Sequence, residues 1–214
     1  MENDIIEIIN YTKKYNNNCI LNNININIKS GTCCGFIGRN GSGKSMLFKA
    51  ISGFIKPTSG MIKVRGKVIG KDIDFPDNTG ILIESPGYLP QYTAFENLKF
   101  LAGINKKIEE KEIKETLDSL QLPWISDKKV KNFSLGMKQK LGIAQAIMEN
   151  QEILILDEPM NGLDKEGVNI VRKRLLKEKQ KGKTILLASH IQDDIEILCD
   201  NVFELDNGYM QLVK

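Results

Sequence analysis

The chain has 214 residues, of which 41% are hydrophobic and 27% are charged, and its formal net charge at pH 7 is +3. This length is sufficient for one large domain or two small ones with a buried core. The mild charge argues against a nucleic-acid-binding protein, which would need many lysines and arginines to neutralise phosphates. The acidic N-terminus does not resemble a secretory signal, and no apolar run approaches the roughly 18 residues that cross a bilayer. If the protein works at a membrane, we therefore expect other chains to form the part that spans it.

The N-terminal part of the chain is expected to be rich in strands. Residues 22–29 (NNININIK) alternate polar and apolar side chains, which is typical of a half-buried antiparallel strand. Residues 33–38 form a short apolar strand that leads into a glycine-rich turn, and residues 44–54 have the pattern of a helix that ends near Gly53. The strands predicted in this part are 5–9, 20–28, 33–38, 61–64 and 80–84.

From about residue 94 the pattern changes to helix, with apolar residues three and four positions apart. The helices predicted here are 94–104, 109–122, which Pro123 closes, and 134–150. Strands and helices then alternate. They are a strand at 152–157, a helix at 165–180, a strand at 184–189, a short helix from Gln192, and a strand at 202–206 before an Asn207-Gly208 hairpin turn.

This order predicts an α/β fold. The apolar strands 153–156 and 185–188 suit a parallel sheet that is covered on both faces. The simplest layout is one domain over residues 1–214. A helical insertion of about 95–150 would separate two parts of one core, about 1–94 and 151–214.

The cysteines and lysine clusters have ordinary explanations. The four cysteines contain no Cys-x-x-Cys pair, and with one histidine they cannot form a zinc site of the usual spacing. Their use fits a reducing cytosol. The densest lysine clusters, 127–131 and 172–183, are expected to be solvated helix faces, with contact to anionic lipid headgroups as the alternative.

The segment GRNGSGKS (38–45) carries the clearest chemical signal, because it has the pattern Gly-x-x-x-x-Gly-Lys-Ser between a predicted strand and a predicted helix. Its glycines let the backbone curl so that successive N–H groups point at a phosphate chain, and the helix adds its partially positive end. Lys44 can reach the outer phosphates, and Ser45 can ligate Mg²⁺. The alternative is a plain glycine turn.

Three further features are ambiguous when they are taken alone. In ILILDE (153–158), Asp157 and Glu158 end an apolar strand, where they could bind Mg²⁺ and activate water or simply cap a helix. Ser134 and Gly136 open a helix, which makes either a second anion site or an ordinary N-cap. His190 is the single histidine, and a lone histidine is usually a surface or core side chain without a special role.

Together these features resemble the ATP-binding cassette (ABC) family, the motor subunits of ABC transporters, and the resemblance covers nearly the whole chain in the family's order. It implies a P-loop NTPase of the ABC type, with a mixed sheet core, an antiparallel β subdomain and an inserted α-helical subdomain. It also implies ATP and Mg²⁺ as cofactors. Glu158 falls at the family's catalytic glutamate, and His190 at its switch histidine.

The resemblance assigns the other site residues as well. The ATP-binding set is Tyr15, which is placed like the aromatic that stacks on adenine, with Gly38, Arg39, Asn40, Gly41, Ser42, Gly43, Lys44, Ser45 and Met46. The signature motif, which contacts the ATP of a partner subunit, is Ser134, Leu135, Gly136 and Met137 within FSLGM (133–137). Asp164 belongs to the D-loop in NGLD (161–164), and the Mg²⁺ ligands are Ser45, Glu84 and Asp157.

The family implies two copies packed head to tail, with each ATP between the phosphate loop of one and the signature helix of the other. Donors from both sides would then share the charge of the triphosphate. It also implies separate transmembrane permease subunits, peripheral association with the membrane through them at its cytoplasmic face, and no nucleic-acid partner. The apolar candidates for the docking surface are Tyr88, Leu89, Tyr92 and Phe95.

The chain departs from the family pattern at three positions. Leu135 stands where a glycine is usual, and Met137 where a glutamine is usual. Glu84 replaces the usual glutamine, which is either neutral variation or a group feature. The runs LIESPG and SLGMKQKLGIA resemble the bacitracin- and lantibiotic-type export ATPases, which implies protection against a peptide antibiotic. The alternatives are an ABC ATPase for another substrate, a cassette ATPase acting on ribosomes or DNA, and a nucleotide-binding regulator without turnover.

Overall fold

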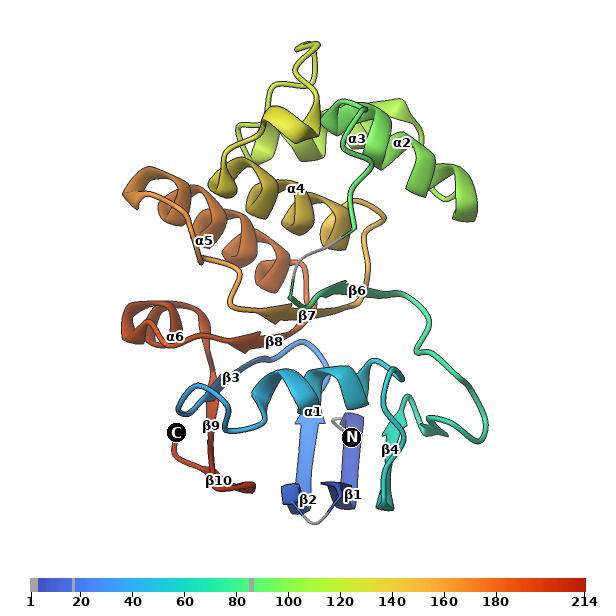
Figure 1. The fold of residues 1–214 in the computed structure, drawn as a ribbon, viewed down its shortest axis with the longest axis vertical. Coiled ribbons are helices and arrows are strands. Elements are labelled where there is room, and N and C mark those ends of the chain that lie inside the picture. Colours follow the sequence, from blue (N-terminus) through green and yellow to red (C-terminus); the bar gives the residue numbers. More distant parts are fainter. Residues whose placement is uncertain (1–3, 17, 85–86) are drawn as a thin grey trace.

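The computed structural model describes residues 4–16, 18–84 and 87–214, and Figure 1 shows their arrangement in two sheets with helices between and above them. One sheet has four strands in the order β2-β1-β4-β5, and the other has six in the order β10-β9-β3-β8-β7-β6. The predicted α/β class is confirmed.

The four-stranded sheet is antiparallel and comes from the N-terminal part of the chain. β1 (Asp4–Tyr15) pairs with β2 (Asn18–Lys29) on one side and β4 (Ser59–Val64) on the other, and β5 (Lys67–Val68) pairs with β4. In β2 the isoleucines at 24, 26 and 28 are buried and the asparagines between them are exposed, so the predicted alternation is confirmed. The short β5 has no sequence signal and was not predicted.

The six-stranded sheet is mixed. Its parallel strands are β3 (Cys33–Ile37), β6 (Thr79–Leu82), β7 (Ile153–Asp157), β8 (Thr184–Ala188) and β9 (Asn201–Asp206), and β10 (Tyr209–Leu212) is antiparallel to β9. All residues of β7 and β8 are buried, as expected for strands covered on both faces. Because β3, β8 and β7 are neighbours and parallel, the loops that follow them meet at one edge of the sheet.

The helices form two groups. α1 (Lys44–Ile51) lies between the two sheets (Figure 1), where its Leu47 and Phe48 pack into one apolar core with Phe36 and the inner face of the antiparallel sheet. α2 (Ala94–Asn105), α3 (Glu110–Ser119), a 3-10 turn (Val130–Asn132) and α4 (Leu135–Ile147) form a layer above the six-stranded sheet with α5 (Lys165–Gln180). The short α6 (Gln192–Leu198) follows β8.

Three predicted helix ends were wrong, and one of them is that of α4, which ends at Ile147 rather than at Asn150. α3 ends at Ser119 rather than at Leu122, because Gln121 takes a left-handed backbone conformation (φ 53°) and turns the chain so that Leu120 and Leu122 are buried. α1 ends at Ile51 rather than near Gly53, because the chain turns at Gly53 with φ 85°. Among the described residues, no helix combines the length and the apolar character that spanning a membrane requires.

Candidate functional site

The loop between β3 and α1 wraps around the amine of Lys44. The Nζ of Lys44 donates hydrogen bonds to the carbonyl oxygens of Gly38 at 2.7 Å and Arg39 at 3.1 Å, and the Ser42 N–H also donates to Arg39. Gly38 has φ 141°, and a Cβ at this position would lie 2.2 Å from the carbonyl oxygen of Leu205. The loop can therefore follow this path only with glycine at 38.

This loop borders a cavity of about 660 Å³. Of the predicted ATP-binding residues, those that line it are Asn40, Gly41, Gly43, Lys44, Ser45 and Met46. Glu84, Asp157 and Glu158 line the same cavity, so the structure brings the phosphate loop and the predicted carboxylates together. A pocket of this size with convergent polar groups is typical of a ligand site.

Asp157, at the end of β7, has the environment of a cation ligand. Burial raises the pKa of its carboxyl group above the ordinary value, against the lowering effects of a hydrogen bond with Ser45 and the charge of Lys44. Its Oδ1 is buried and has no hydrogen-bond partner among the described residues. The described part of the chain contains no group of three or more His, Cys, Asp or Glu side chains that could hold a metal. A cation here would therefore need oxygens from Asp157, Ser45 and a phosphate ligand, which is how Mg²⁺ is usually held.

Glu158 and His190 are in direct contact. The Nδ1 of His190 donates to the Oε2 of Glu158 at 2.8 Å, although the two residues are 32 positions apart. Glu158 has a left-handed backbone (φ 49°), and its N–H bonds the Ala188 carbonyl at the end of β8. His190 is half exposed, whereas the Glu158 side chain is 21% exposed. This hydrogen bond shows that His190 is not an isolated surface residue.

A buried ion pair holds the segment that carries His190. The carboxylate of Asp194 is fully buried and accepts hydrogen bonds from Arg172 of α5 at 2.6 Å and from the Ser189 hydroxyl at 3.1 Å. The same hydroxyl accepts the N–H of Ile191 at 3.1 Å. Residues 189 and 191, on either side of the histidine, are thereby fixed to α6.

Replacing Arg172 with methionine is expected to lower the free energy of unfolding by about 3–5 kcal/mol, because it leaves the charge of Asp194 buried without its partner. Urea denaturation measures this change. Lys111→Met is the control, since it removes one side of an exposed pair with Glu115 and should cost less than about 1 kcal/mol. Equal losses for the two variants would contradict the prediction.

Glu84 lies where β6 ends and borders the cavity. It forms an ion pair with Lys49 of α1, and its side chain is 64% exposed. Its backbone is left-handed (φ 57°), so both Glu84 and Glu158 occupy a conformation that is uncommon for residues other than glycine. Ser85 and Pro86 of the LIESPG run lie outside the described residues.

The signature residues form a second cavity of about 380 Å³ with the D-loop. Its walls include Ser134, Leu135, Gly136, Met137 and Asp164. Ser134 is the N-cap of α4 and accepts the N–H of Met137 at 3.2 Å, and Asp164 is the N-cap of α5 and accepts the N–H of Gly167 at 2.7 Å. Leu135 is 68% exposed and lines both cavities. The other signature residues are not in the walls of the phosphate-loop cavity.

Four of the predicted ATP-binding residues do not line the phosphate-loop cavity. Gly38, Arg39 and Ser42 shape the loop, and the Ser42 hydroxyl is buried without a partner among the described residues. Tyr15 lies outside the cavity, 46% exposed, with the Lys13 amine 4.8 Å from its ring centre.

Three residues that sequence reasoning missed line this cavity, namely Ile20, Gln139 and Asn161. Gln139 follows Leu135 by one helical turn, a spacing that could have indicated its place. Asn161 lies inside the quoted NGLD run. Ile20 has no local signal.

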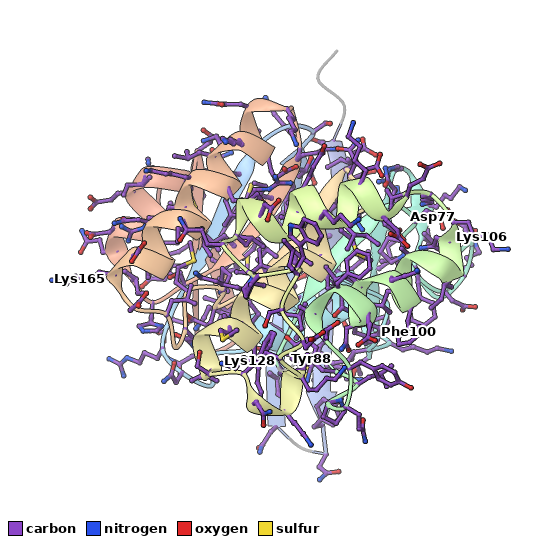
Figure 2. All side chains as sticks on the ribbon, turned by 90° about the horizontal axis from the view of Figure 1, so that it is seen from above. Asp77, Tyr88, Phe100, Lys106, Lys128 and Lys165 are labelled. Carbon is purple, nitrogen blue, oxygen red and sulfur yellow. The ribbon has the colours of Figure 1, made fainter. Side chains whose placement is uncertain are left out.

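An exposed apolar surface lies on the helical layer. Its members are Leu89, Tyr92, Phe100 and Ile104, which are 47%, 39%, 48% and 75% exposed. The rings of Tyr92 and Phe100 are in edge contact with centroids 4.9 Å apart. Tyr88 and Phe100 lie toward the same side of the layer in the view from above (Figure 2). Tyr88 is half-buried, however, and donates to the Lys138 carbonyl at 2.7 Å, and Phe95 packs against the core. Of the four predicted candidates, Leu89 and Tyr92 are exposed.

Comparison with known proteins gives consistent results. Residues 21–161 match the family model described as ABC transporter. The chain is 45% identical to the uncharacterized ABC transporter ATP-binding protein YybJ of Bacillus subtilis (strain 168), over 97% of this chain and 95% of that one. It is 41% identical to the bacitracin transport ATP-binding protein BcrA of Bacillus licheniformis, over 95% of this chain and 67% of that one. It is 36% identical to the lantibiotic transport ATP-binding protein SrtF of Streptococcus pyogenes, over 98% and 90%.

Solved structures match over nearly the full length. The dimeric cassette MJ0796 has a TM-score of 0.85 at 24% identity, covering 98% of this chain and 99% of that one, which shows the fold. The cbiO1 protein of Clostridium perfringens has a TM-score of 0.82 at 31% identity, covering 99% and 88%. From this fold and these matches it follows that the chain belongs to the ABC transporter family, as an ATP-binding subunit that hydrolyses ATP.

Proposed function

We propose that two copies of this chain form the motor of a transporter at the cytoplasmic face of the membrane and power the export of a bacitracin- or lantibiotic-like peptide. The observation that supports the pair most directly is the division of the anion-binding groups between two cavities, one at the phosphate loop and one at the signature helix. If one cavity alone held the triphosphate, the phosphate oxygens on its other side would have no donors from the protein. A second copy can provide these donors.

In this proposal residues 38–45 bind the phosphates through backbone N–H groups, the N-terminus of α1 and the Lys44 amine. Ser45, Asp157 and Glu84 would hold Mg²⁺, which when bound neutralises charge on the phosphates. The buried Oδ1 of Asp157, which has no hydrogen-bond partner within the described part of the chain, supports this set. Tyr15 is proposed to stack on the adenine, which requires the base to extend beyond the phosphate-loop cavity.

Glu158 is proposed as the general base. Its carboxylate borders the cavity and can accept a proton from the attacking water. The hydrogen bond from the Nδ1 of His190 fixes the orientation of that carboxylate. In the imidazolium form, in which both ring nitrogens carry a proton, the Nε2 of His190 can also donate to the outer phosphate. These roles need both groups within one hydrogen-bond network, and the 2.8 Å contact supplies it.

The signature residues are proposed to complete the site of the second copy. Ser134 and Gly136 place a hydroxyl group and the first N–H groups of the helix at the positive end of α4. Leu135 and Met137 leave these donors in place, so we expect activity to persist. Asp164 fixes the start of α5 beside them.

The transmembrane subunits are proposed to dock on the exposed surface formed by Leu89, Tyr92, Phe100 and Ile104. α2 and the loop before it carry these four large apolar side chains with exposed fractions of 39–75%, and the rings of Tyr92 and Phe100 are in contact. Exposed apolar groups that gather on a surface mark protein contacts. The division into a core (about 1–94 and 151–214) and a helical part (about 95–150) would let this layer move with its partner.

The peptide cargo follows from the relatives. Two of them are named for bacitracin and lantibiotic transport. The run LIESPG, which contains Glu84, resembles the same group of export ATPases. We expect that deleting this chain from its native cell lowers the concentration of bacitracin or of a lantibiotic that stops growth. Glu158→Gln should have the same effect as the deletion, because transport needs hydrolysis.

Growth in a dilution series of each peptide measures this change, with chloramphenicol as a control that does not share the peptide chemistry. Unchanged sensitivity to all of the peptides would contradict the proposed cargo without affecting the assignment as an ATPase. Equal sensitisation to chloramphenicol would contradict it as well.

A further inference from the structure

The helix that carries the signature motif touches the segment 158–162 of its own chain at two points. Leu135 and Gln139 are one turn apart on α4, so their side chains lie on the same face of the helix. Both line the phosphate-loop cavity together with Glu158 and Asn161. The contacts therefore lie at the centre of the proposed hydrolysis site.

The first contact is a hydrogen bond to the backbone of Glu158. The Nε2 of Gln139 donates to the Glu158 carbonyl oxygen at 3.1 Å. The same carbonyl accepts the N–H of Asn161 at 3.1 Å, and the Glu158 N–H donates to Ala188 at 2.9 Å. Glu158 has φ 49°, a left-handed conformation that is unfavourable for residues other than glycine, and these bonds stabilise its backbone in that conformation.

The second contact is apolar. A Cβ on Gly162 would lie 2.6 Å from the Cδ2 of Leu135, so the leucine rests directly on the glycine backbone. Gly136 also approaches this segment, since a Cβ there would lie 3.1 Å from the Gly162 carbonyl oxygen. With a glycine at 135 this apolar contact would be absent. The departure from the family pattern thus adds a contact between α4 and the 158–162 segment.

We propose that Gln139 is a positioning residue, whose side-chain amide fixes the backbone of Glu158 so that the Glu158 carboxylate keeps its hydrogen bond with His190. Together with Leu135, Gln139 connects the signature end of α4 to the hydrolysis site of the same subunit. This inference rests on the proposed role of Glu158 as general base.

The test replaces Gln139 in the full chain and measures ATP hydrolysis by phosphate release with Mg²⁺. Gln139→Met keeps the length of the side chain and removes the donor. We expect kcat to fall about tenfold or more, since small misplacements of a reacting group have effects of this size. KM for ATP should change less than about twofold, because Lys44 and the phosphate loop are untouched.

Three further variants separate positioning from general damage. Gln139→Glu keeps the shape but carries no donor when ionised, and should fall like Gln139→Met. Gln139→Lys restores a donor and should recover most of the rate. Gln145→Met makes the same change farther along α4, beside Met148 and Glu149 at another cavity, and should leave the rate unchanged. Thermal unfolding of each variant confirms that it is folded.

Wild-type kcat in both Gln139→Met and Gln139→Glu would overturn the inference, as would a loss that Gln145→Met reproduces. A cycle with Glu158→Gln gives the final criterion. If Gln139 acts through Glu158, adding Gln139→Met to Glu158→Gln causes no further loss. If the fold-losses in kcat of the two single variants multiply in the double variant, the two residues act independently and the inference is overturned. Normal turnover in Glu158→Gln alone would instead refute the proposed role of Glu158.

Discussion

Replacing Lys44 with alanine is expected to weaken ATP binding by about 100-fold or more, since a charged donor to a phosphate contributes roughly 1.5–3 kcal/mol and the change also removes two bonds that shape the loop. These bonds join the Lys44 amine to the Gly38 and Arg39 carbonyls. Without them the N–H groups of the loop are no longer held in one arrangement. Calorimetric titration with ATP and Mg²⁺ measures the dissociation constant.

Lys67→Ala is the matched control, because Lys67 is an exposed lysine on β5 that does not line the cavity. Its affinity for ATP should equal that of the wild type. An unchanged affinity in Lys44→Ala would remove the phosphate-loop assignment, and with it the proposal that this cavity holds the nucleotide.

Glu158→Gln is expected to lower kcat by about 10²–10⁴-fold, the range that general base catalysis contributes. The amide keeps the size of the side chain and a hydrogen bond with His190, but it cannot take a proton from water. ATP should therefore bind and remain, and the two-copy state should accumulate. Phosphate release measures the first effect, and light scattering with and without ATP measures the second.

Glu115→Gln, at an exposed position on α3, should behave as the wild type in both measurements. The wild-type rate per chain should also rise with protein concentration, because each site needs the signature end of a second copy. A rate independent of concentration, together with a monomeric Glu158→Gln variant in ATP, would contradict the two-copy proposal.

Features confined to one short segment were predictable from the sequence. The phosphate loop is continuous in residues 38–45, and β3 and β7, which lead into the site, are plain apolar runs. The helix at 165–180 was predicted with the bounds that the structure shows, because Asp164 is a strong N-cap and Gly182 follows its end. Local hydrogen bonding and side-chain periodicity decide such features, and both can be read along the chain.

The sequence by itself determined which residues could perform the chemistry and that the class is α/β. Only the tertiary structure decided which of them meet. The parallel pairing of β7 with β8 brings Glu158 to His190, and the packing of α4 over the sheet brings Gln139 to Glu158. It also left Tyr15 outside the cavity and placed Ile20 in its wall. These contacts depend on strand order and helix packing, which are set by the burial of distant apolar surfaces against each other and leave no mark in a local pattern.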